Sequence, residues 1–326
     1  MELIHRALER RAALLERLAA EGTDGVRLLH GIAEGRPGLT VDRYGSVLLL
    51  QTGRDVLEPG EVEAIAETVQ GALGVELVPV YNHRPAWRAG FETVHPAPSL
   101  DNPEVLEGGL RFDARPRHRG LDPLLFLDLR HVRRRVRAHE AASVLNLFAY
   151  TCGVSVMAAA GGASEVWSVD FASSSLAVGE ANAARNGVPF HAVCEDVFPA
   201  VRQLAGMPLG GRRGRRPDCV KLAARDFELV VLDPPRFAKS RWGVVDLVRD
   251  YAALFKPAVS CVAPDGVIVA TNNVAKVELE AWLDGLRRCA RKAGRELLDI
   301  EVLPPDEDFP SFDGRPPLKV AWCRVA

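Results

Sequence analysis

The chain has 326 residues, of which 48% are hydrophobic and 26% are charged, and its formal net charge is −2. These values describe an ordinary soluble globular protein with one large or two modest domains and ample apolar content for a core. No apolar run approaches the ~18 residues of a membrane-spanning helix, which excludes that class of membrane protein.

The N-terminal segment, MELIHRALERRAALLERLAAEG, predicts an amphipathic helix over residues 1–22, with Leu3, Leu8, Leu15 and Leu18 as its apolar positions. It lacks the apolar core of a signal peptide. The chain's six cysteines are scattered without a CxxC pair, which favours reduced thiols in the cytosol and argues against a zinc site. We therefore expect a cytoplasmic protein that needs no metal.

A small α/β domain is predicted over residues 23–108. The run RLLHGIAEGRPGLTVDRYGSVLLLQT predicts strands joined by a turn rich in Gly and Pro at GRPG (35–38), followed by a helix around 58–73 and a strand at 75–81. The proline-studded connector HPAPSLDNPEVLEGG (95–109) then indicates a boundary. A second, larger domain is expected over residues 109–326.

The second domain alternates strands and helices from about residue 143. SVLNLFAY, EVWSVDF, HAVCEDVF, FELVVLDPP and GVIVATNN predict strands, and helical segments such as VSVMAAAGG and SSSLAVGEANAARNG lie between them. This alternation predicts an α/β fold with a mostly parallel, doubly wound, Rossmann-like sheet. Ligands of such sheets bind at the carboxyl ends of the strands, beside the topological switch point.

Polar residues gather at those predicted strand ends. Since FAYTCGVSV has no GxGxxG pattern, a dinucleotide site is not indicated. Asp170 could accept both ribose hydroxyls of a nucleoside, and Asp196 could accept from an adenine amino group, which are the contacts that S-adenosylmethionine (SAM) needs. Strand-end aspartates also cap helices, and Asp170 before SSS could do so. Three acids, Asp170, Asp196 and Asp233, end three successive predicted strands, and this repetition favours the cofactor interpretation over capping.

The buried strand ending in VVLDPPRFAKS (230–240) stops at an acid followed by two prolines, which supply no N–H to a ladder. Such a turn could be only a strand terminator. It could also hold a carboxylate and rigid carbonyls in place for a substrate, because in-line group transfer depends on positioning.

Arginines are concentrated in two segments. Residues 111–137 contain nine arginines against three aspartates, and GGRRGRR (210–216) adds four more. Arginine-rich faces are usually solvated surface, but two of them beside a predicted catalytic core favour an anionic polymer as partner.

Several motifs together resemble one family, the class I SAM-dependent methyltransferases that act on large-subunit (23S) ribosomal RNA. FLDLR (126–130), LNLFAYTCG (145–153), SVD (168–170), EDVF (195–198), LDPPRF (232–237) and LKVAWCRV (318–325) are similar to its FLDQR, LNxFSYTGG, DPPxF and closing CRV motifs. RLLHGIAEGRPGLTVDRYG (27–45) resembles the family's central domain, so the likeness covers essentially the whole chain.

The resemblance implies three groups of site residues. The SAM-binding residues would be Phe126, Leu127, Asp128, Arg130, Asn146, Phe148, Tyr150, Thr151, Cys152, Gly153, Asp170, Phe171, Asn182, Glu195, Asp196 and Asp233. The catalytic residues would be Asp233, Pro234, Pro235, Phe237, Asn272 and Asn273, with Phe237 stacking on an extruded base. The residues that contact RNA phosphates would be Arg133, Arg134, Arg135, Arg212, Arg213, Arg215 and Arg216.

The sequence departs from the family pattern at three places. Relatives often begin with a PUA RNA-binding domain, and this chain starts where that domain would have ended. RNA affinity is then expected from the small domain and the arginines. Leu129 stands where relatives have Gln or His, and Cys152 stands where they often have Gly.

The sequence also bears on which atom of the RNA base would be methylated. The cytosine-C5 branch of the family carries a nucleophilic cysteine in a Thr/Ser-Cys-Ser turn, but here that place holds Asn272 and Asn273 in VIVATNNVAK. Cys261 and Cys152 are interpreted as packing residues. The Asn-Asn turn resembles the SNN of the guanine-N7 branch, which favours methylation of a purine nitrogen, guanine N7 first.

Three functions are compatible with these observations. An RNA methyltransferase acting on ribosomal RNA or a ribosomal particle is favoured. A small-molecule methyltransferase would not need the arginines, and a non-catalytic RNA-binding assembly factor would not need SAM. The sequence leaves the oligomeric state open, a homodimer included.

Overall fold

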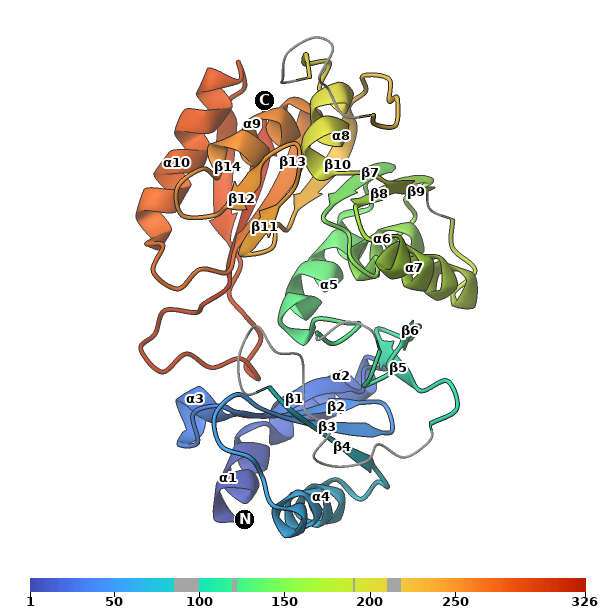
Figure 1. Cartoon of the computed structure of the whole chain (residues 1–326), viewed down its shortest axis with the longest axis vertical. Helices are drawn as coiled ribbons and strands as arrows, with labels where there is room; N and C mark the ends of the chain where they lie inside the picture. The colour runs from blue at the N-terminus through green and yellow to red at the C-terminus, as the bar shows by residue number, and fades with distance from the viewer. Residues whose placement is uncertain (85–99, 119–121, 190, 210–217) are drawn as a thin grey trace. The chain divides into compact units, whose positions relative to one another are not determined.

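The computed structural model describes residues 1–84, 100–118, 122–189, 191–209 and 218–326. The predicted phosphate contacts Arg212, Arg213, Arg215 and Arg216 lie outside these residues. Contacts divide the chain into two compact units (Figure 1). Unit 1 comprises residues 1–130 and 305–316, and unit 2 comprises 131–304 and 317–326. The domain boundary predicted near residue 108 stays a prediction.

Unit 1 begins with two short helices instead of the single predicted helix. Helices α1 (Glu2–Arg10) and α2 (Ala12–Ala20) are separated at Arg11, whose φ of −99° and ψ of 1° depart from helical values. The Arg11 side chain is buried and donates to the Ala7 carbonyl and the Glu34 carboxylate. The single-helix prediction was wrong because periodicity cannot show that a charged residue turns inward.

The unit 1 sheet has four strands in the order β1-β2-β3-β4. Strands β1 (Gly25–His30), β2 (Leu39–Tyr44) and β3 (Val47–Thr52) are antiparallel neighbours, and a short helix α3 (Gly31–Glu34) separates the first two. Strand β4 (Val78–His83) pairs with β3 in parallel. Parallel neighbours need a crossover, and helix α4 (Pro59–Leu73) supplies it.

Helix α4 confirms the helix predicted around 58–73. Pro59 is at its first position, where the missing N–H costs nothing, and Glu58 and Glu61 form a capping box. It ends at Gly74 in the left-handed conformation. Its buried face, with Val62, Ile65 and Val69, packs in one apolar core with the strands and helix α1.

Among its described residues, unit 1 also contains a hairpin and a helical turn. The hairpin joins β5 (Glu104–Glu107) to β6 (Leu110–Asp113), and the 3-10 turn η1 covers Leu127–Leu129. Backbone bonds from Asp24 N to Leu106 O and from Gly109 N to Gly22 O fix the hairpin beside β1.

Unit 2 contains the predicted Rossmann-like sheet, seven strands in the order β14-β15-β13-β10-β7-β8-β9 (Figure 1). The strands are β7 (Ser143–Leu147), β8 (Glu165–Asp170), β9 (His191–Cys194), β10 (Phe227–Leu232), β13 (Val262–Asn272), β14 (Leu297–Val302) and β15 (Lys319–Val325). Only β15 runs antiparallel to its neighbours. The order reverses between β7 and β10, so the switch point predicted from the sequence lies there.

Helices connect these strands on both faces. They are α5 (Arg130–His139), α6 (Gly153–Ala160), α7 (Ser173–Arg185), α8 (Val197–Leu204), α9 (Ala252–Ser260) and α10 (Leu279–Lys292). The chain moves outward through α6 and α7 to β9 and then returns across the sheet. Because parallel crossovers are right-handed, the later helices lie on the opposite face from α6 and α7. A small hairpin, β11 (Phe237–Lys239) and β12 (Val244–Asp246), follows β10.

The main core of unit 2 consists of the apolar residues of the parallel strands, including Leu145, Val230, Leu232 and Ile268, with the inner faces of α8, α9 and α10. Strands buried on both faces explain the continuous apolar runs of the sequence. Within the described parts of the chain, no helix is long and apolar enough to cross a membrane.

Candidate active site at the carboxyl ends of the parallel strands

The register of the sheet aligns the ends of its central strands. Asn146 of β7 is opposite Val231 of β10 and Ser168 of β8, and Leu232 is opposite Ala270 of β13. The residues that follow these positions therefore meet at one edge. They include Phe148–Cys152 after β7, Asp170 at the end of β8, Asp233 after β10, and Asn272 at the end of β13.

The turn after β7 has a strained backbone. Phe148, Tyr150 and Cys152 have φ values of 60°, 50° and 61°, a region that non-glycine residues rarely adopt. Each such residue costs on the order of 1–3 kcal/mol and persists only where its surroundings hold it, and such strain clusters at ligand sites. These positive φ values, which occur at every second residue from Phe148, explain why the strand predicted over SVLNLFAY ends at Leu147.

Surrounding groups hold this turn in place. The Tyr150 amide donates to Asp170 Oδ2 at 2.9 Å, the Cys152 amide donates to the Ala149 carbonyl at 2.8 Å, and Asn182 Nδ2 donates to the Thr151 carbonyl at 3.3 Å. The turn is thus fixed before any ligand binds. Asn182 serves here as a support from helix α7.

Cys152 fits the turn only because α7 carries a glycine opposite it. Cys152 is fully buried, and a Cβ built on Gly179 would lie 2.8 Å from the Cys152 Cβ. Burial raises the pKa of the Cys152 thiol to about 12, so the sulfur stays protonated at neutral pH. At this position the chain has packed a buried thiol against a helix glycine.

Asp170 is held as a buried acceptor. Its Oδ1 accepts from the Ala172 amide at 2.8 Å and its Oδ2 from the Tyr150 amide at 2.9 Å. Burial raises the pKa of Asp170, although these amide bonds oppose the shift. Helix α7 begins after Ala172, so Asp170 is not its N-cap residue. Each carboxylate oxygen retains a lone pair that could accept a ribose hydroxyl.

The next residue, Phe171, has a side chain 63% exposed. A buried carboxylate beside an open aromatic ring, at the end of the second strand, suits a nucleoside with vicinal hydroxyls. The strained turn, Asp170 and Phe171 therefore fit the nucleoside part of SAM.

Three other predicted cofactor residues have structural partners. Asp196 is the N-cap of α8 and accepts from the Phe198 amide at 2.9 Å, which is the capping role weighed for strand-end aspartates. Asn146 is buried below the turn, where its Nδ2 donates to Ser155 Oγ at 2.9 Å. Glu195 accepts from the amides of Asp196 and Val220.

Asp233 lies beside polar groups at the end of the neighbouring strand β13. The Thr271 hydroxyl of β13 donates to Asp233 Oδ1, and the Tyr251 hydroxyl donates to the Thr271 carbonyl at 2.8 Å. Burial and the nearby Asp233 charge raise the pKa of Tyr251 well above 10, so Tyr251 remains a neutral donor. Thr271 and Tyr251 thus orient the carboxylate.

Sequence reasoning missed the residues Gly179, Tyr251 and Thr271. Only Thr271 carried a signal, as the residue directly before Asn272 and Asn273. The other two become evident only when the helices are placed.

The two asparagines of the TNN turn have different surroundings. Asn272 is fully buried, where its Nδ2 donates to the Leu247 carbonyl at 3.2 Å and its Oδ1 accepts from the Val274 amide at 3.0 Å. Asn273 is exposed. Phe237, after the two prolines, is 65% exposed.

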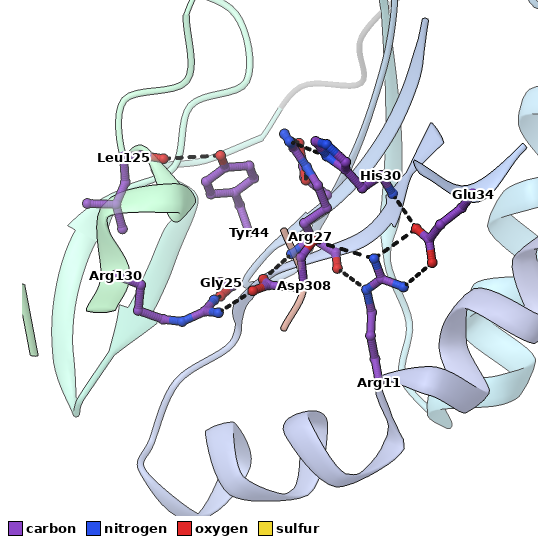
Figure 2. A network of polar contacts seen from close by, with 10 residues as sticks. Arg11, Gly25, Arg27, His30, Glu34, Tyr44, Leu125, Arg130 and Asp308 are labelled. Carbon is purple, nitrogen blue, oxygen red and sulfur yellow. Dashed lines mark hydrogen bonds and ion pairs between the residues drawn. The ribbon is translucent and has the colours of Figure 1, made fainter. Parts of the chain in front are cut away.

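The predicted FLDLR residues Phe126, Leu127, Asp128 and Arg130 belong to unit 1. Figure 2 shows that Arg130 belongs to a buried polar network. Arg130 Nη2 donates to Asp308 Oδ1 at 2.6 Å and its Nη1 to the Gly25 carbonyl at 2.9 Å. Asp308 Oδ2 accepts from the Arg27 amide at 3.0 Å. These contacts bind the segment 305–316 to strand β1.

The same network continues to the N-terminal helices (Figure 2). Arg11 makes a bidentate pair with Glu34 at 2.7 and 2.8 Å, and Glu34 Oε2 also accepts from the His30 amide at 2.7 Å. Tyr44 donates to the Leu125 carbonyl at 3.1 Å. Arg130, the arginine of the FLDLR motif, therefore has partners that stabilise unit 1.

The arginines predicted to contact RNA differ in exposure. Arg133 is only 2% exposed, so its side chain does not reach the surface. Arg134 is exposed. Arg135 is exposed but pairs with Glu301 at 2.6 Å and lies 4.9 Å from the Trp322 ring centre.

Comparison with known proteins identifies the class of this protein. Residues 13–324 match the S-adenosylmethionine-dependent methyltransferase family, and the chain belongs to that family. It is therefore a SAM-dependent methyltransferase.

Proteins similar to this chain have names that are more specific than the family's. A ribosomal RNA large subunit methyltransferase of Deinococcus radiodurans is 33% identical over 89% of this chain and 69% of its own length. Ribosomal RNA large subunit methyltransferase I of Aeromonas salmonicida is 28% identical over 93% of this chain and 74% of its own length. A putative methyltransferase crystallised with SAH has the same fold, with a TM-score of 0.79 at 24% identity, over 99% of this chain and 80% of that one.

Proposed function

We propose that this methyltransferase modifies a base of large-subunit ribosomal RNA at a nitrogen, with guanine N7 favoured. The observation that carries this proposal is the strand-end arrangement of an oriented carboxylate, Asp233, two prolines and the exposed ring of Phe237. The relatives named as ribosomal RNA large subunit methyltransferases support the substrate class.

SAM supplies an electrophilic methyl group on a sulfonium. A purine nitrogen attacks the methyl carbon, the carbon–sulfur bond breaks, and the sulfur keeps the electron pair. Guanine N7 carries no proton, so this step needs no general base. The protein must instead orient the base, and its own residues are suited to that task.

In this proposal Asp233 accepts a hydrogen bond from a ring or amino N–H of the target base. The Thr271 hydroxyl occupies one carboxylate oxygen, which limits the directions in which the other can accept. Pro234 and Pro235 fix the backbone after it, and Phe237 stacks on the extruded base. Asp170, Phe171 and the strained turn after β7 bind SAM.

The role of the asparagines is reassigned. Both polar groups of the Asn272 side chain are used within the protein, so Asn272 supports the turn. Asn273, which is exposed, is the residue proposed to reach the purine edge. Of the arginines, exposed Arg134 is a more suitable phosphate contact than buried Arg133.

The test is methyl transfer from labelled SAM to protein-free large-subunit ribosomal RNA, followed by mass mapping of the nucleosides. We expect 7-methylguanosine from the wild type and no product from Asp233→Ala, whose SAM affinity by calorimetry should fall much less than its methyl transfer. Product from Asp233→Ala at the wild-type rate would remove Asp233 from the mechanism.

Other products would redirect the proposal. 5-Methylcytidine would move the target to cytosine C5. Transfer to small molecules but not to RNA would make the protein a small-molecule methyltransferase.

A further inference from the structure

The β11–β12 hairpin begins two residues after the prolines that follow Asp233. Phe237 is paired with Asp246, and Lys239 with Val244, across the two strands. Paired residues in an antiparallel hairpin share a face, so these four side chains form its outer face. Ala238 and Val245 point the other way, and Val245 is buried in the core of unit 2.

The hairpin is held rigidly on unit 2. At its tip, Ser240 Oγ accepts from the Trp242 amide at 3.0 Å, and the Ser240 amide donates to the Gly243 carbonyl at 2.9 Å. Gly243 lies directly against the Phe198 ring of α8, where an added Cβ would be 3.1 Å from ring carbons. Arg241 donates to the Asp218 carbonyl at 3.2 Å. A surface with this support is preorganised for binding.

The outer face and the residues that flank the hairpin, Arg236 and Val248, combine exposed apolar groups with cations. Besides Phe237, Val244 is 42% exposed and Val248 is 46% exposed. Arg236 and Lys239 are exposed, and within the described part of the chain neither has a hydrogen-bond or ion-pair partner. Among the described residues, neither cation therefore contributes a hydrogen bond or an ion pair to the fold.

The segment 236–250, which contains the hairpin, differs in net charge from the whole chain. Residues 236–250 contain four basic and two acidic residues, a net charge of +2, whereas the whole chain has −2. The acid on the face, Asp246, accepts from the amides of Val248 and Arg249, which lower its pKa. Its charge is thus partly offset by backbone N–H groups.

We propose that this outer face, with the flanking residues Arg236 and Val248, binds the single-stranded RNA next to the target nucleotide. Arg236 and Lys239 contact phosphates, and Val244 and Val248 pack against a neighbouring base. Apolar groups interleaved with cations suit a single strand, whose bases are open for contact; a duplex presents mainly phosphates and hydroxyls. This inference rests on the proposed function and adds the surface that receives the substrate.

The experiment compares two double variants of the full chain. Arg236→Gln/Lys239→Gln removes one charge from the hairpin and one from the residue directly before it, and Arg288→Gln/Arg291→Gln removes two exposed charges from α10 in the same unit. Binding of protein-free large-subunit ribosomal RNA is measured from low to moderate salt. SAM affinity and thermal melting report whether each variant is folded.

We expect the hairpin variant to bind RNA more weakly and to reduce the slope of log K against log salt by about 1.4, since each single-strand phosphate contact contributes about 0.7. Its KM for RNA should rise while its SAM affinity stays at the wild-type value. The α10 variant should match the wild type in both. If the double hairpin variant melts early, Lys239→Gln alone should reduce the slope by about 0.7.

The outcomes separate the two proposals. An unchanged slope in a hairpin variant, with methyl transfer by the wild type intact, would overturn this inference alone. Loss of affinity for ribosomal particles without any change on protein-free RNA would also overturn it, because the hairpin would then bind a protein. A wild type that neither binds nor methylates RNA would overturn the proposed function together with the inference.

Discussion

Substitution of Asp308 tests the buried network of unit 1. Asp308 is fully buried and accepts from Arg130 Nη2 at 2.6 Å and from the Arg27 amide at 3.0 Å. Asp308→Ala would leave both donors buried without this acceptor. Removing one partner of a buried pair costs about 3–5 kcal/mol.

The remaining partners reduce this cost. Arg130 keeps Asp306 Oδ2 at 2.8 Å from its Nε and the Gly25 carbonyl at 2.9 Å from its Nη1. Burial also raises the pKa of Asp308, against the effect of Arg130, so the ionised carboxylate carries a desolvation cost that the variant relieves. We therefore expect a loss of unfolding free energy of about 3 kcal/mol, at the lower end of that range.

The adjacent Glu307 provides the control. Its exposed carboxylate pairs with exposed Arg17 at 2.6 Å, and such surface pairs contribute at most about 1 kcal/mol. Urea unfolding gives the global difference, and hydrogen exchange of the β1 peptide reports on the Arg27 amide directly. If Asp308→Ala costs no more than Glu307→Ala, and the β1 amides keep their protection, this reasoning is refuted.

Three further changes test other parts of the molecule. Asp170→Ala should weaken SAM binding by about 1.5–3 kcal/mol, the value of charged hydrogen bonds, and unchanged affinity by calorimetry would contradict the ribose assignment. Gly179→Ala should cost about 1–3 kcal/mol by overpacking Cys152, and adding Cys152→Gly should restore most of the loss in a denaturation experiment. Burial and Arg27 lower the pKa of His30 from 6.5 to about 4, so folding keeps this ring neutral. Because the unfolded chain takes up a proton at His30 that the folded chain does not, unit 1 should lose stability as pH falls from 6.5 to 4, by at most about 3 kcal/mol. His30→Gln should flatten that part of the pH profile, whereas His5→Gln on the exposed face of α1 should not.

The parallel sheet could be predicted from the sequence because its signals are local. Continuous apolar runs such as FELVVL, each followed by a polar residue and a helical segment, specify both the strands and the edge at which they end. The hairpin after β10 was not predicted, since FAK and VVD are too short for a periodicity argument.

The limits of sequence reasoning are clearest in two aspartates with the same local pattern. Asp170 ends β8 and Asp196 follows β9 by two residues, each just before a helix, yet Asp196 caps the following helix whereas Asp170 supports the strained turn of a neighbouring strand. The difference depends on Tyr150, which is distant in the sequence. Arg130 and Arg133 show the same limit, because no pattern distinguishes a buried arginine from a solvated one.

The chemistry of the thiols gives the sharpest test of the target atom. Methylation of cytosine C5 requires a thiolate that adds to C6 of the base. Burial raises the pKa of both Cys152 and Cys261 to about 12, so neither forms an appreciable amount of thiolate at neutral pH. Cys261 Sγ also lies among the core residues of unit 2, 3.3 Å from the Pro257 carbonyl.

Neither sulfur can therefore act as the nucleophile without opening the fold. RNA containing 5-fluorocytidine, which traps a covalent thiol–base adduct, should give no shifted band with this protein on a denaturing gel. Cys261→Ala and Cys152→Ala should retain methyl transfer, with modest packing losses of about 1 kcal/mol in stability. A covalent band that disappears in one of these variants would show that a thiol reaches the base, and would restore cytosine C5 as the target in place of a purine nitrogen.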